Sequence, residues 1–390
     1  MRRLPKAIVP IFGTTFADTL GITLMIPLLP VVMQEYHLSD VAAGALLSIP
    51  AFCSVIAAPI WGKLSDRWGR KPIVIVAQVL SLIGYVMIAT SHSIFLIFLS
   101  RIISGCGGGS LGAVQSYIAD VTEEGDRDFA FSSYGAVFGM AFIVGPVISG
   151  FLMKHGLAIP FLAAAGLEAF NIVFTAFFLP RVQKQTRSKT SIRSSLKAAN
   201  APGVRIVLVR QFLAILAIVC FLANFGLYLQ HLFHEHVANV SWLLALAGVA
   251  GGAAMIFIVT PLSSRIGDRW VAQIGLILSV GAYAMLAFVN GVPAFCGAVV
   301  VWAVGSALVE PTLTALLSVR ASAKERGAIM GLSDSINSLA MIVGPAAGAA
   351  LIGVNPRYLG IVPAAAAALA LLLGRPGKFS PSTRESARSA

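Results

Sequence analysis

Long apolar runs, each followed by a short polar segment, fill almost the whole chain. The runs are continuous rather than alternating, which favours helices over barrel strands, whose pattern would be about ten residues of alternating polarity. A helix that crosses the hydrocarbon core of a bilayer needs roughly 20 apolar residues. The pattern predicts twelve membrane-spanning helices over residues 7–33, 41–61, 73–90, 94–119, 129–153, 161–179, 206–229, 242–262, 271–289, 293–319, 328–353 and 358–373.

Composition agrees with this pattern. Hydrophobic residues make up 57% of the 390 positions and charged residues only 11%, against about 25% charged in an ordinary soluble domain. Such a chain cannot build a solvated surface, which excludes a soluble globular protein. The opening segment MRRLPK leads directly into a run of spanning length without a small-residue cleavage site, so we expect the first helix to remain in the mature protein.

The positions of Lys and Arg predict the orientation. When the helices alternate from a cytoplasmic start, all of the 28 Lys and Arg residues except Arg101, Lys154 and Arg357 fall in cytoplasmic segments. Positive residues concentrate on that side of membrane proteins, so we expect both termini in the cytoplasm. The net charge of +12 therefore reflects topology and not a nucleic-acid partner, and membrane lipids are the expected contacts of these basic residues.

A basic, Ser-rich connector divides the chain. We expect a first six-helix half over 1–180, a linker over 181–205, a second half over 206–373 and a cytoplasmic tail over 374–390. The segment LSSRIGDR at 262–269 echoes LSDRWGRK at 64–71, and GPAAGA from 344 echoes GPVISG from 145. Duplicated halves with a binding site near the bilayer midplane are common among carriers. The predicted fold class is an all-α membrane protein with two pseudo-symmetric halves.

Ionisable residues inside the predicted spans are the candidates for function. A charge at the bilayer centre costs about 2.5 to 3.5 kcal/mol, so it is a functional candidate by default. We assign proton coupling or a substrate cavity to Asp18, Arg101, Glu168, Glu310 and Asp334, with the polar neighbours Gln115, Asn171 and Asn337. Asp18 is favoured, because it lies near the midplane with Thr14 one turn earlier on the same face.

Structural explanations compete with these assignments. Arg101 is close enough to a helix end to extend its side chain to the membrane surface. Asp334 lies in the first turns of its helix, where an acid complements the helix dipole. Glu168 and Glu310 could equally belong to interhelical pairs.

Other chemistry finds little support in the sequence. The four cysteines lie apart within predicted spans, so neither a disulfide nor a metal site is expected. His231, His234 and His236 are interpreted as an ordinary hydrated loop rather than a metal site. No catalytic motif is present, and we expect neither enzyme activity nor a cofactor.

The segment GKLSDRWGRKP at 62–72 places five charges between two apolar runs, and we interpret it as a short cytoplasmic loop. It resembles the loop motif of the major facilitator superfamily at Gly62, Asp66, Arg67, Gly69, Arg70 and Lys71. We expect Asp66 to accept hydrogen bonds from the amino end of the helix at 328–353, and Arg67 or Arg70 to pair with Asp120. These contacts would form a cytoplasmic gate.

Further segments resemble the twelve-helix drug:proton antiporters of this superfamily. LGITLMIPLLP at 20–30 is similar to their first-helix motif, and Arg101 with Gly105 is similar to their Arg-x-x-x-Gly. Gly145, Pro146 and Gly150 match most of their glycine-proline bend. The resemblance extends to tetracycline-type efflux proteins and implies a functional Asp18. The helices at 242–262 and 271–289 hold neither a histidine nor an acidic residue, although tetracycline carriers use a His and an Asp there.

We therefore expect a proton-coupled exporter of amphiphilic drugs or small organic molecules, working by alternating access. The proton gradient would supply the energy, the chain would act as a monomer, and it would reside in the plasma membrane, the inner membrane of a bacterium. A specific metabolite or siderophore exporter of the same superfamily is the main alternative. An importer and a non-transporting membrane sensor remain further alternatives.

Overall fold

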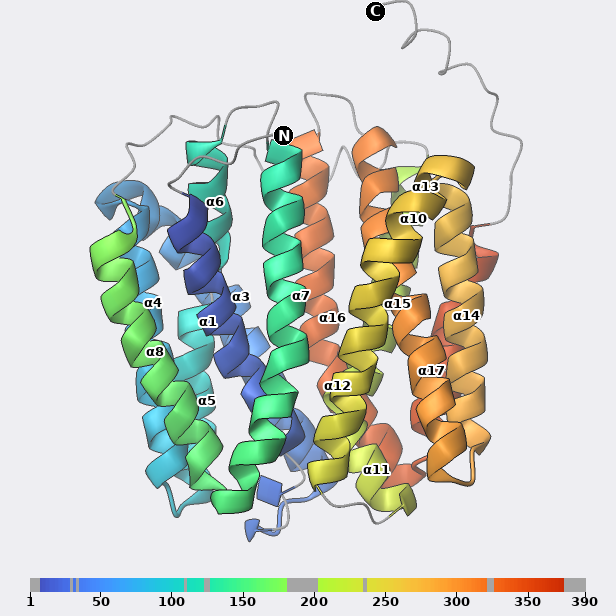
Figure 1. The fold of residues 1–390 in the computed structure, drawn as a ribbon, viewed down its shortest axis with the longest axis horizontal. Coiled ribbons are helices and arrows are strands. Elements are labelled where there is room, and N and C mark those ends of the chain that lie inside the picture. The colour runs from blue at the N-terminus through green and yellow to red at the C-terminus, as the bar shows by residue number, and fades with distance from the viewer. Residues whose placement is uncertain are drawn as a thin grey trace, which may run out of the picture.

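The computed structural model describes residues 8–28, 31–32, 35–108, 111–122, 127–180, 203–233, 237–320 and 326–374. Every regular element within these ranges is a helix (Figure 1). The first half contains α1 (Ile8–Leu24), η1 (Ile26–Leu28), α3 (Asp40–Trp68), α4 (Arg70–Thr90), α5 (Ile94–Gly108), α6 (Leu111–Val121), α7 (Arg127–Leu152), η2 (Met153–His155) and α8 (Ala158–Phe178). The second half contains α10 (Val204–Ala223), α11 (Phe225–Phe233), α12 (Val237–Ala254), η3 (Met255–Val259), α13 (Thr260–Ile266), α14 (Asp268–Phe288), α15 (Val292–Arg320), α16 (Arg326–Val354) and α17 (Tyr358–Leu372).

Nine helices in the described ranges are long and apolar enough to cross a membrane, and α1 and α17 are shorter apolar helices. The protein is thus a multi-pass membrane protein, while the count of twelve spans stays a prediction. Some predicted spans are interrupted. Asn224 separates α10 from α11. The π-helical turn η3 lies just before Pro261 of α13. Proline has no backbone N–H, so one helical hydrogen bond is lost there.

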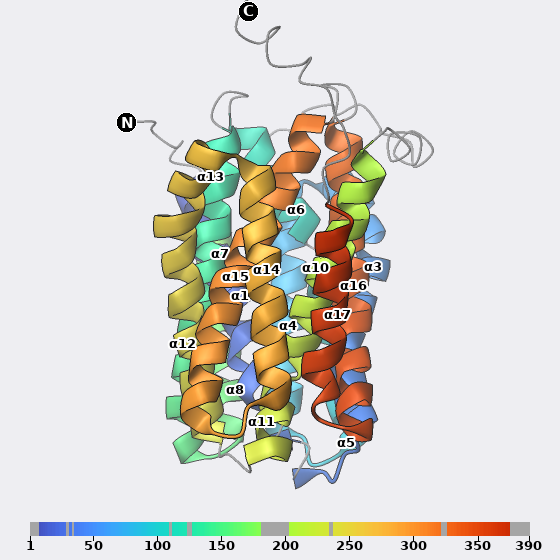
Figure 2. The ribbon, with the colours of Figure 1, turned by 90° about the vertical axis from the view of Figure 1, so that its right-hand side faces the viewer.

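The two halves repeat one packing scheme. In the first half α4 packs on α5 and α8, and α1 packs on α7 and α8. In the second half α14 packs on α15 and α17, and α10 packs on α16 and α17. The halves meet where α3 packs on α16 and α7 on α12. The sequence echoes therefore reflect a structural duplication, as Figures 1 and 2 show from two sides.

The segment at 62–72 is not the loop that the charge pattern predicts. Helix α3 continues to Trp68 and α4 begins at Arg70, so only Gly69 stands between them. Gly69 has a φ of 95°, and its counterpart Gly267 has 84°, a region that favours glycine because it has no Cβ. The prediction failed because a single glycine turns the chain sharply enough for the charged residues to remain helical.

Large apolar side chains cover the outside of the bundle. Phe95, Phe177 and Phe257 are each more than 70% exposed, as expected for side chains that contact lipid. Inside, small residues let the helices approach closely, which is how membrane helices gain packing energy. A Cβ at Gly105, for example, would lie 2.6 Å from the Cα of Pro50.

The described residues join the two halves at one end of the bundle. We name the end with the turns at Gly69 and Gly267 the basic end, and the other the far end. At the far end, His231 Nε2 of α11 lies 3.2 Å from Asp40 Oδ1 of α3. The rings of Phe151 in α7 and Trp242 in α12 meet edge to face at 5.7 Å. The described contacts thus join the halves at the far end.

Candidate functional site

Asp18 of α1 lies at the centre of a polar cluster in the first half. Asn171 of α8 donates through Nδ2 to Asp18 Oδ1 at 2.6 Å and to the carbonyl oxygen of Thr14 at 3.3 Å. The carboxylate also interacts with the side chains of Glu168 and Gln78. The structure therefore brings together the predicted residues Asp18, Glu168 and Asn171.

Gln78 and Thr175 extend the cluster on its basic-end side. Gln78 Nε2 donates to Thr175 Oγ1 at 3.0 Å, and that oxygen lies 3.0 Å from Thr14 Oγ1. We name these residues of α1, α4 and α8 the acid cluster: Thr14, Asp18, Gln78, Glu168, Asn171 and Thr175.

The acid cluster is withdrawn from solvent, and its hydrogen bonding is incomplete. Glu168 and Asn171 are each 1% exposed. Among the described residues, Glu168 Oε1, Asn171 Oδ1 and Gln78 Oε1 have no hydrogen-bond partner. An unsatisfied buried polar atom typically costs about 1 to 3 kcal/mol, so a site that retains three of them is a candidate for function.

Arg101 of α5 is buried rather than extended to the membrane surface. It is 7% exposed, and its Nη1 lies 2.7 Å from the Sδ of Met25. Within the described part of the chain its Nη2 has no partner. The surface-extension alternative is therefore wrong for this conformation, and Arg101 faces the interior beside Tyr85, with which it interacts electrostatically.

The two acids of the second half occupy a different environment. Glu310 of α15 and Asp334 of α16 are both exposed although they lie well within long helices. They interact electrostatically with each other, and Tyr134 of α7 interacts with both Asp334 and Asp18. Asp334 therefore faces the first half, and the two exposed acids lie toward the space between the halves.

Asn337 has a structural partner. Gln211 Nε2 of α10 donates to Ser333 Oγ at 2.8 Å and to Asn337 Oδ1 at 3.1 Å. These bonds tie α10 to α16 on the side of α16 adjacent to Asp334. Gln115 of α6 is half-buried, and among the described side chains none links it to the acid cluster.

The predicted antiporter bend packs against α1. A Cβ at Gly145 would overlap Thr23 Oγ1, and that hydroxyl donates to the carbonyl oxygen of Ala141 at 3.0 Å. Pro146 lies within α7, and a Cβ at Gly150 would lie 2.6 Å from the Cβ of Ser241. The missing side chain at Gly145 thus lets α1 pack closely against α7, and the missing side chain at Gly150 does the same for α12 of the other half.

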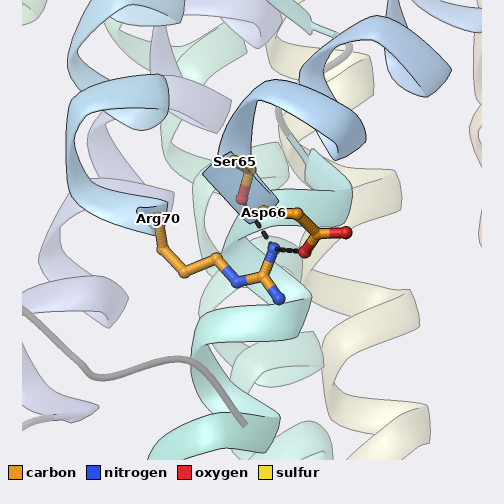
Figure 3. A network of polar contacts seen from close by, with 3 residues as sticks. All are labelled: Ser65, Asp66 and Arg70. Carbon is orange, nitrogen blue, oxygen red and sulfur yellow. Dashed lines mark hydrogen bonds and ion pairs between the residues drawn. The ribbon is translucent and has the colours of Figure 1, made fainter. Parts of the chain in front are cut away.

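The predicted gate residues at the basic end form local contacts (Figure 3). Arg70 Nη1 donates to Ser65 Oγ at 2.7 Å and to Asp66 Oδ1 at 2.9 Å. Lys71 Nζ donates to the carbonyl oxygen of Ala176 in α8 at 2.6 Å, and Arg67 is exposed. Within the described ranges Asp66 shows no bond to α16. The side chain of Asp120 lies outside the described residues, so its pairing stays a prediction.

Other chemistry has little basis in the described ranges. These contain no group of three or more His, Cys, Asp and Glu residues that could hold a metal ion, and His234 and His236 lie outside them. The four cysteines are free thiols.

Sequence reasoning missed several residues near the acid cluster. Gln78 and Tyr85 of α4 were overlooked because α4 carries no charge after Lys71. A signal was present, since the two lie seven residues apart and thus share a helix face. Thr175 and Tyr134 carried no comparable signal.

Comparison with known proteins supports a family assignment. The family model described as "Major Facilitator Superfamily" matches residues 11–234 and 211–389. The chain is 28% identical to the class C tetracycline resistance protein of Escherichia coli, over 87% of this chain and 88% of that protein. It is 30% identical to the class G protein of Vibrio anguillarum, over 84% and 86%. It is 25% identical to multidrug resistance protein 1 of Bacillus subtilis, over 88% and 89%.

Solved structures support the fold. The human organic anion transporter MFSD10 matches with a TM-score of 0.75 at 18% identity, over 95% of this chain and 99% of that one. A mutant of the nucleoside transporter NupG matches with a TM-score of 0.79 at 14% identity, over 94% and 98%. Carriers with different named solutes share this architecture, so the fold alone does not select a solute.

Proposed function

The chain belongs to the Major Facilitator Superfamily, and we propose that it is a proton-coupled exporter of cationic amphiphilic molecules. The observation that carries this proposal is the acid cluster, in which the carboxyl group of the half-buried Asp18 of α1 meets that of the buried Glu168 of α8. The export direction is inferred from the named relatives, which are tetracycline and multidrug resistance proteins.

The acid cluster suits reversible proton binding. Two carboxylates that share a desolvated site repel each other, so holding one proton between them is favourable. Asn171 donates to Asp18 and supports its charged form when the proton leaves. The interhelical contact of Glu168 is therefore compatible with function, and it links the charge state of the cluster to the packing of α1 on α8.

The exposed acids of the second half favour a positively charged solute. In the described part of the chain, neither Glu310 nor Asp334 forms an ion pair with Lys or Arg. Tyr134 adds an aromatic face on the opposite half, which attracts cations through its ring. A cation with apolar groups would fit these acids and the apolar helices around them.

Transport would proceed by alternating access of the two halves. We assign the basic end to the cytoplasm from the Lys and Arg distribution, which places the far-end contacts on the outside. A solute would enter from the cytoplasm in this arrangement, and rocking of the halves would release it outside. Exchange of one inward proton for one outward monovalent cation moves no net charge, so the pH difference drives it. Each pH unit supplies about 1.4 kcal/mol, enough for a solute gradient of about tenfold.

Uptake into inverted vesicles tests the proposal, with ethidium as the cationic amphiphile. An inside-acid gradient should drive ethidium accumulation by the wild type, and a protonophore should abolish it. Asp18→Asn should remove gradient-driven uptake while the protein still inserts, and Glu35→Gln, at an exposed far-end position, is the matched control. Gradient-independent accumulation, or full activity of Asp18→Asn, would contradict the assignment.

A solute panel separates the proposed drug exporter from a specific metabolite or siderophore exporter. Competition by structurally unrelated cations would support broad recognition. Competition by a single anionic or neutral metabolite would favour the alternative.

A further inference from the structure

Tyr85 of α4 lies at the junction of α1, α4 and α8. It is 3% exposed and packs in an apolar cluster with Leu24, Ala164 and Ala165. Its Oη would lie 3.0 Å from a Cβ built on Gly21. The hydroxyl therefore rests against the backbone of α1, where a side chain larger than that of glycine would displace it.

The register of the helices places Tyr85 one turn beyond the acid pair Asp18 and Glu168. Gly21 follows Asp18 by three residues, which is about one turn of α1. Ala164 and Ala165 precede Glu168 by about one turn of α8, which runs in the opposite direction to α1 (Figure 1). Both helices thus place the tyrosine on the far-end side of the acid pair.

Arg101 lies one turn further in the same direction. Its Nη1 contacts Met25, which follows Gly21 by four residues on α1 and packs against the apolar cluster of Tyr85. The order from the middle of the first half toward the far end is therefore acid pair, Tyr85 and Arg101.

Electrostatic interactions link Tyr85 to the acid pair on one side and to Arg101 on the other. Tyr85 interacts with Glu168, Arg101 and Asp18. The groups on either side of it each keep one polar atom without a partner among the described residues, namely Arg101 Nη2 and Glu168 Oε1. A hydroxyl is both a donor and an acceptor, so Tyr85 has the chemistry to connect them.

The second half provides an internal comparison. Tyr283 occupies the same position in α14 as Tyr85 in α4, counted from Gly267 and Gly69. Its Oη accepts a hydrogen bond from Trp302 Nε1 of α15 at 2.8 Å, and Phe221 of α10 packs against both rings. In the second half, Tyr283 therefore lies among uncharged side chains and its hydroxyl is hydrogen-bonded. In the first half, Tyr85 lies near charged groups.

We propose that Tyr85 relays protons between the outer side and the acid pair. The step rests on the proposed proton-coupled export. A hydronium ion that enters from the far end gives its proton to Tyr85 Oη, and the original hydroxyl proton passes to the Glu168 carboxylate. The products are water, a neutral tyrosine and a carboxyl group, so nothing is oxidised. The reverse sequence returns a proton outward.

Transport by the Tyr85→Phe variant in proteoliposomes tests the relay. Tyr283→Phe is the matched control, because it also removes a buried tyrosine hydroxyl. Two rates are compared for each protein: ethidium transport driven by a pH gradient, and ethidium counterflow at equal pH, which needs no net proton movement. Tyr85→Phe should slow the driven rate by about 100-fold, the low end of the effect of a positioned proton-transfer group. Its counterflow rate should stay close to that of the wild type.

The outcomes separate the relay from other roles. Equal losses of both rates in Tyr85→Phe would make the tyrosine structural, and an unchanged driven rate with an unchanged pH profile would remove it from the proton path. A similar selective loss in Tyr283→Phe would also overturn the inference. If the wild type shows no driven transport, the proposed function itself fails, and this result is distinct from a failure of the relay alone.

Discussion

At the scale of single residues, the polar atoms inside the first half are held by a small number of strong contacts. Asn171 donates to a carboxylate that lies in a membrane helix, and a hydrogen bond to a charged group contributes about 1.5 to 3 kcal/mol. Its other contact, with the carbonyl oxygen of Thr14, fixes the side chain in place. Asn171 therefore connects the charge of Asp18 to the packing of α8.

Asn171→Ala removes this donor, so we expect a lower thermal stability in detergent and a clear loss of gradient-driven ethidium uptake. The expected destabilisation is about 1 to 3 kcal/mol. Scanning fluorimetry together with vesicle uptake measures both effects. Asn290→Ala, at an exposed position after α14, should change neither, and wild-type stability of Asn171→Ala would show that the bond to Asp18 is weak.

At the scale of the helices, glycine residues mark the places where two helices pack closely. Gly145 of α7 faces Thr23 of α1 so closely that a methyl group would overlap the hydroxyl. Asn224, between α10 and α11, makes the corresponding contact in the second half, because its Nδ2 donates to the carbonyl oxygen of Pro345 at 3.0 Å. In each half a polar side chain from a neighbouring segment thus bonds to the proline-containing helix.

Gly145→Ala should destabilise the protein by about 1 to 3 kcal/mol, the usual cost of overpacking. Adding Thr23→Ala should restore part of this loss, because the smaller side chain makes room for the methyl group. Gly166→Ala is the matched control, since nothing lies within 4 Å of a Cβ at that position. Thermal unfolding of the three variants and the wild type measures the effect, and a failure of the double variant to recover would place the strain elsewhere.

The turn between α3 and α4 allows a second test at this scale. Gly69→Ala forces a methyl group onto a residue with a φ of 95°, at a cost of about 1 to 2 kcal/mol. Gly62→Ala places the same group where nothing lies within 4 Å and should be neutral or slightly stabilising. Equal unfolding temperatures for the two variants would mean that the turn relaxes without strain.

At the scale of the whole molecule, the described contacts between the halves gather at the far end. His231 Nε2 lies 3.2 Å from Asp40 Oδ1 across this contact. This polar pair should therefore help to hold the two halves together at the far end. Because it is partly exposed, it contributes about 0.2 to 1 kcal/mol.

His231→Ala should shift the distances across the far end toward longer values, measured between spin labels at positions 93 and 290 in a variant without native cysteines. A contribution of this size changes the population ratio about 1.4- to 5-fold. His92→Ala, at an exposed histidine on the same side, serves as the control. A wild-type distance distribution in His231→Ala would show that this pair does not support the contact.

The basic end allows a prediction from the sequence to be tested. Asp66→Asn should leave insertion intact and lower transport, since we expect its carboxylate to contact the amino end of α16 when the basic end closes. In the described arrangement Asp66 bonds with Arg70 instead. Normal vesicle transport by this variant would remove Asp66 from the gate.

Much of the fold and part of the site could be predicted from the sequence. The apolar runs indicated helices, because a backbone in lipid must satisfy its own hydrogen bonds, and the repeated motifs indicated two halves. Asp18, Glu168 and Asn171 were identifiable because polar groups in apolar runs are costly. The turn at Gly69 was missed, since one glycine with a positive φ leaves no trace in a charge pattern.

What the sequence by itself determined was a membrane protein of duplicated helical halves, since hydrophobicity and charge act locally along the chain. Only the tertiary structure decided which polar groups meet. It joined Asp18 to Glu168 across two helices, placed Tyr85 between them and Arg101, and turned Asp334 toward the other half. These pairings depend on helix rotation and register, which are set by close packing between residues far apart in sequence.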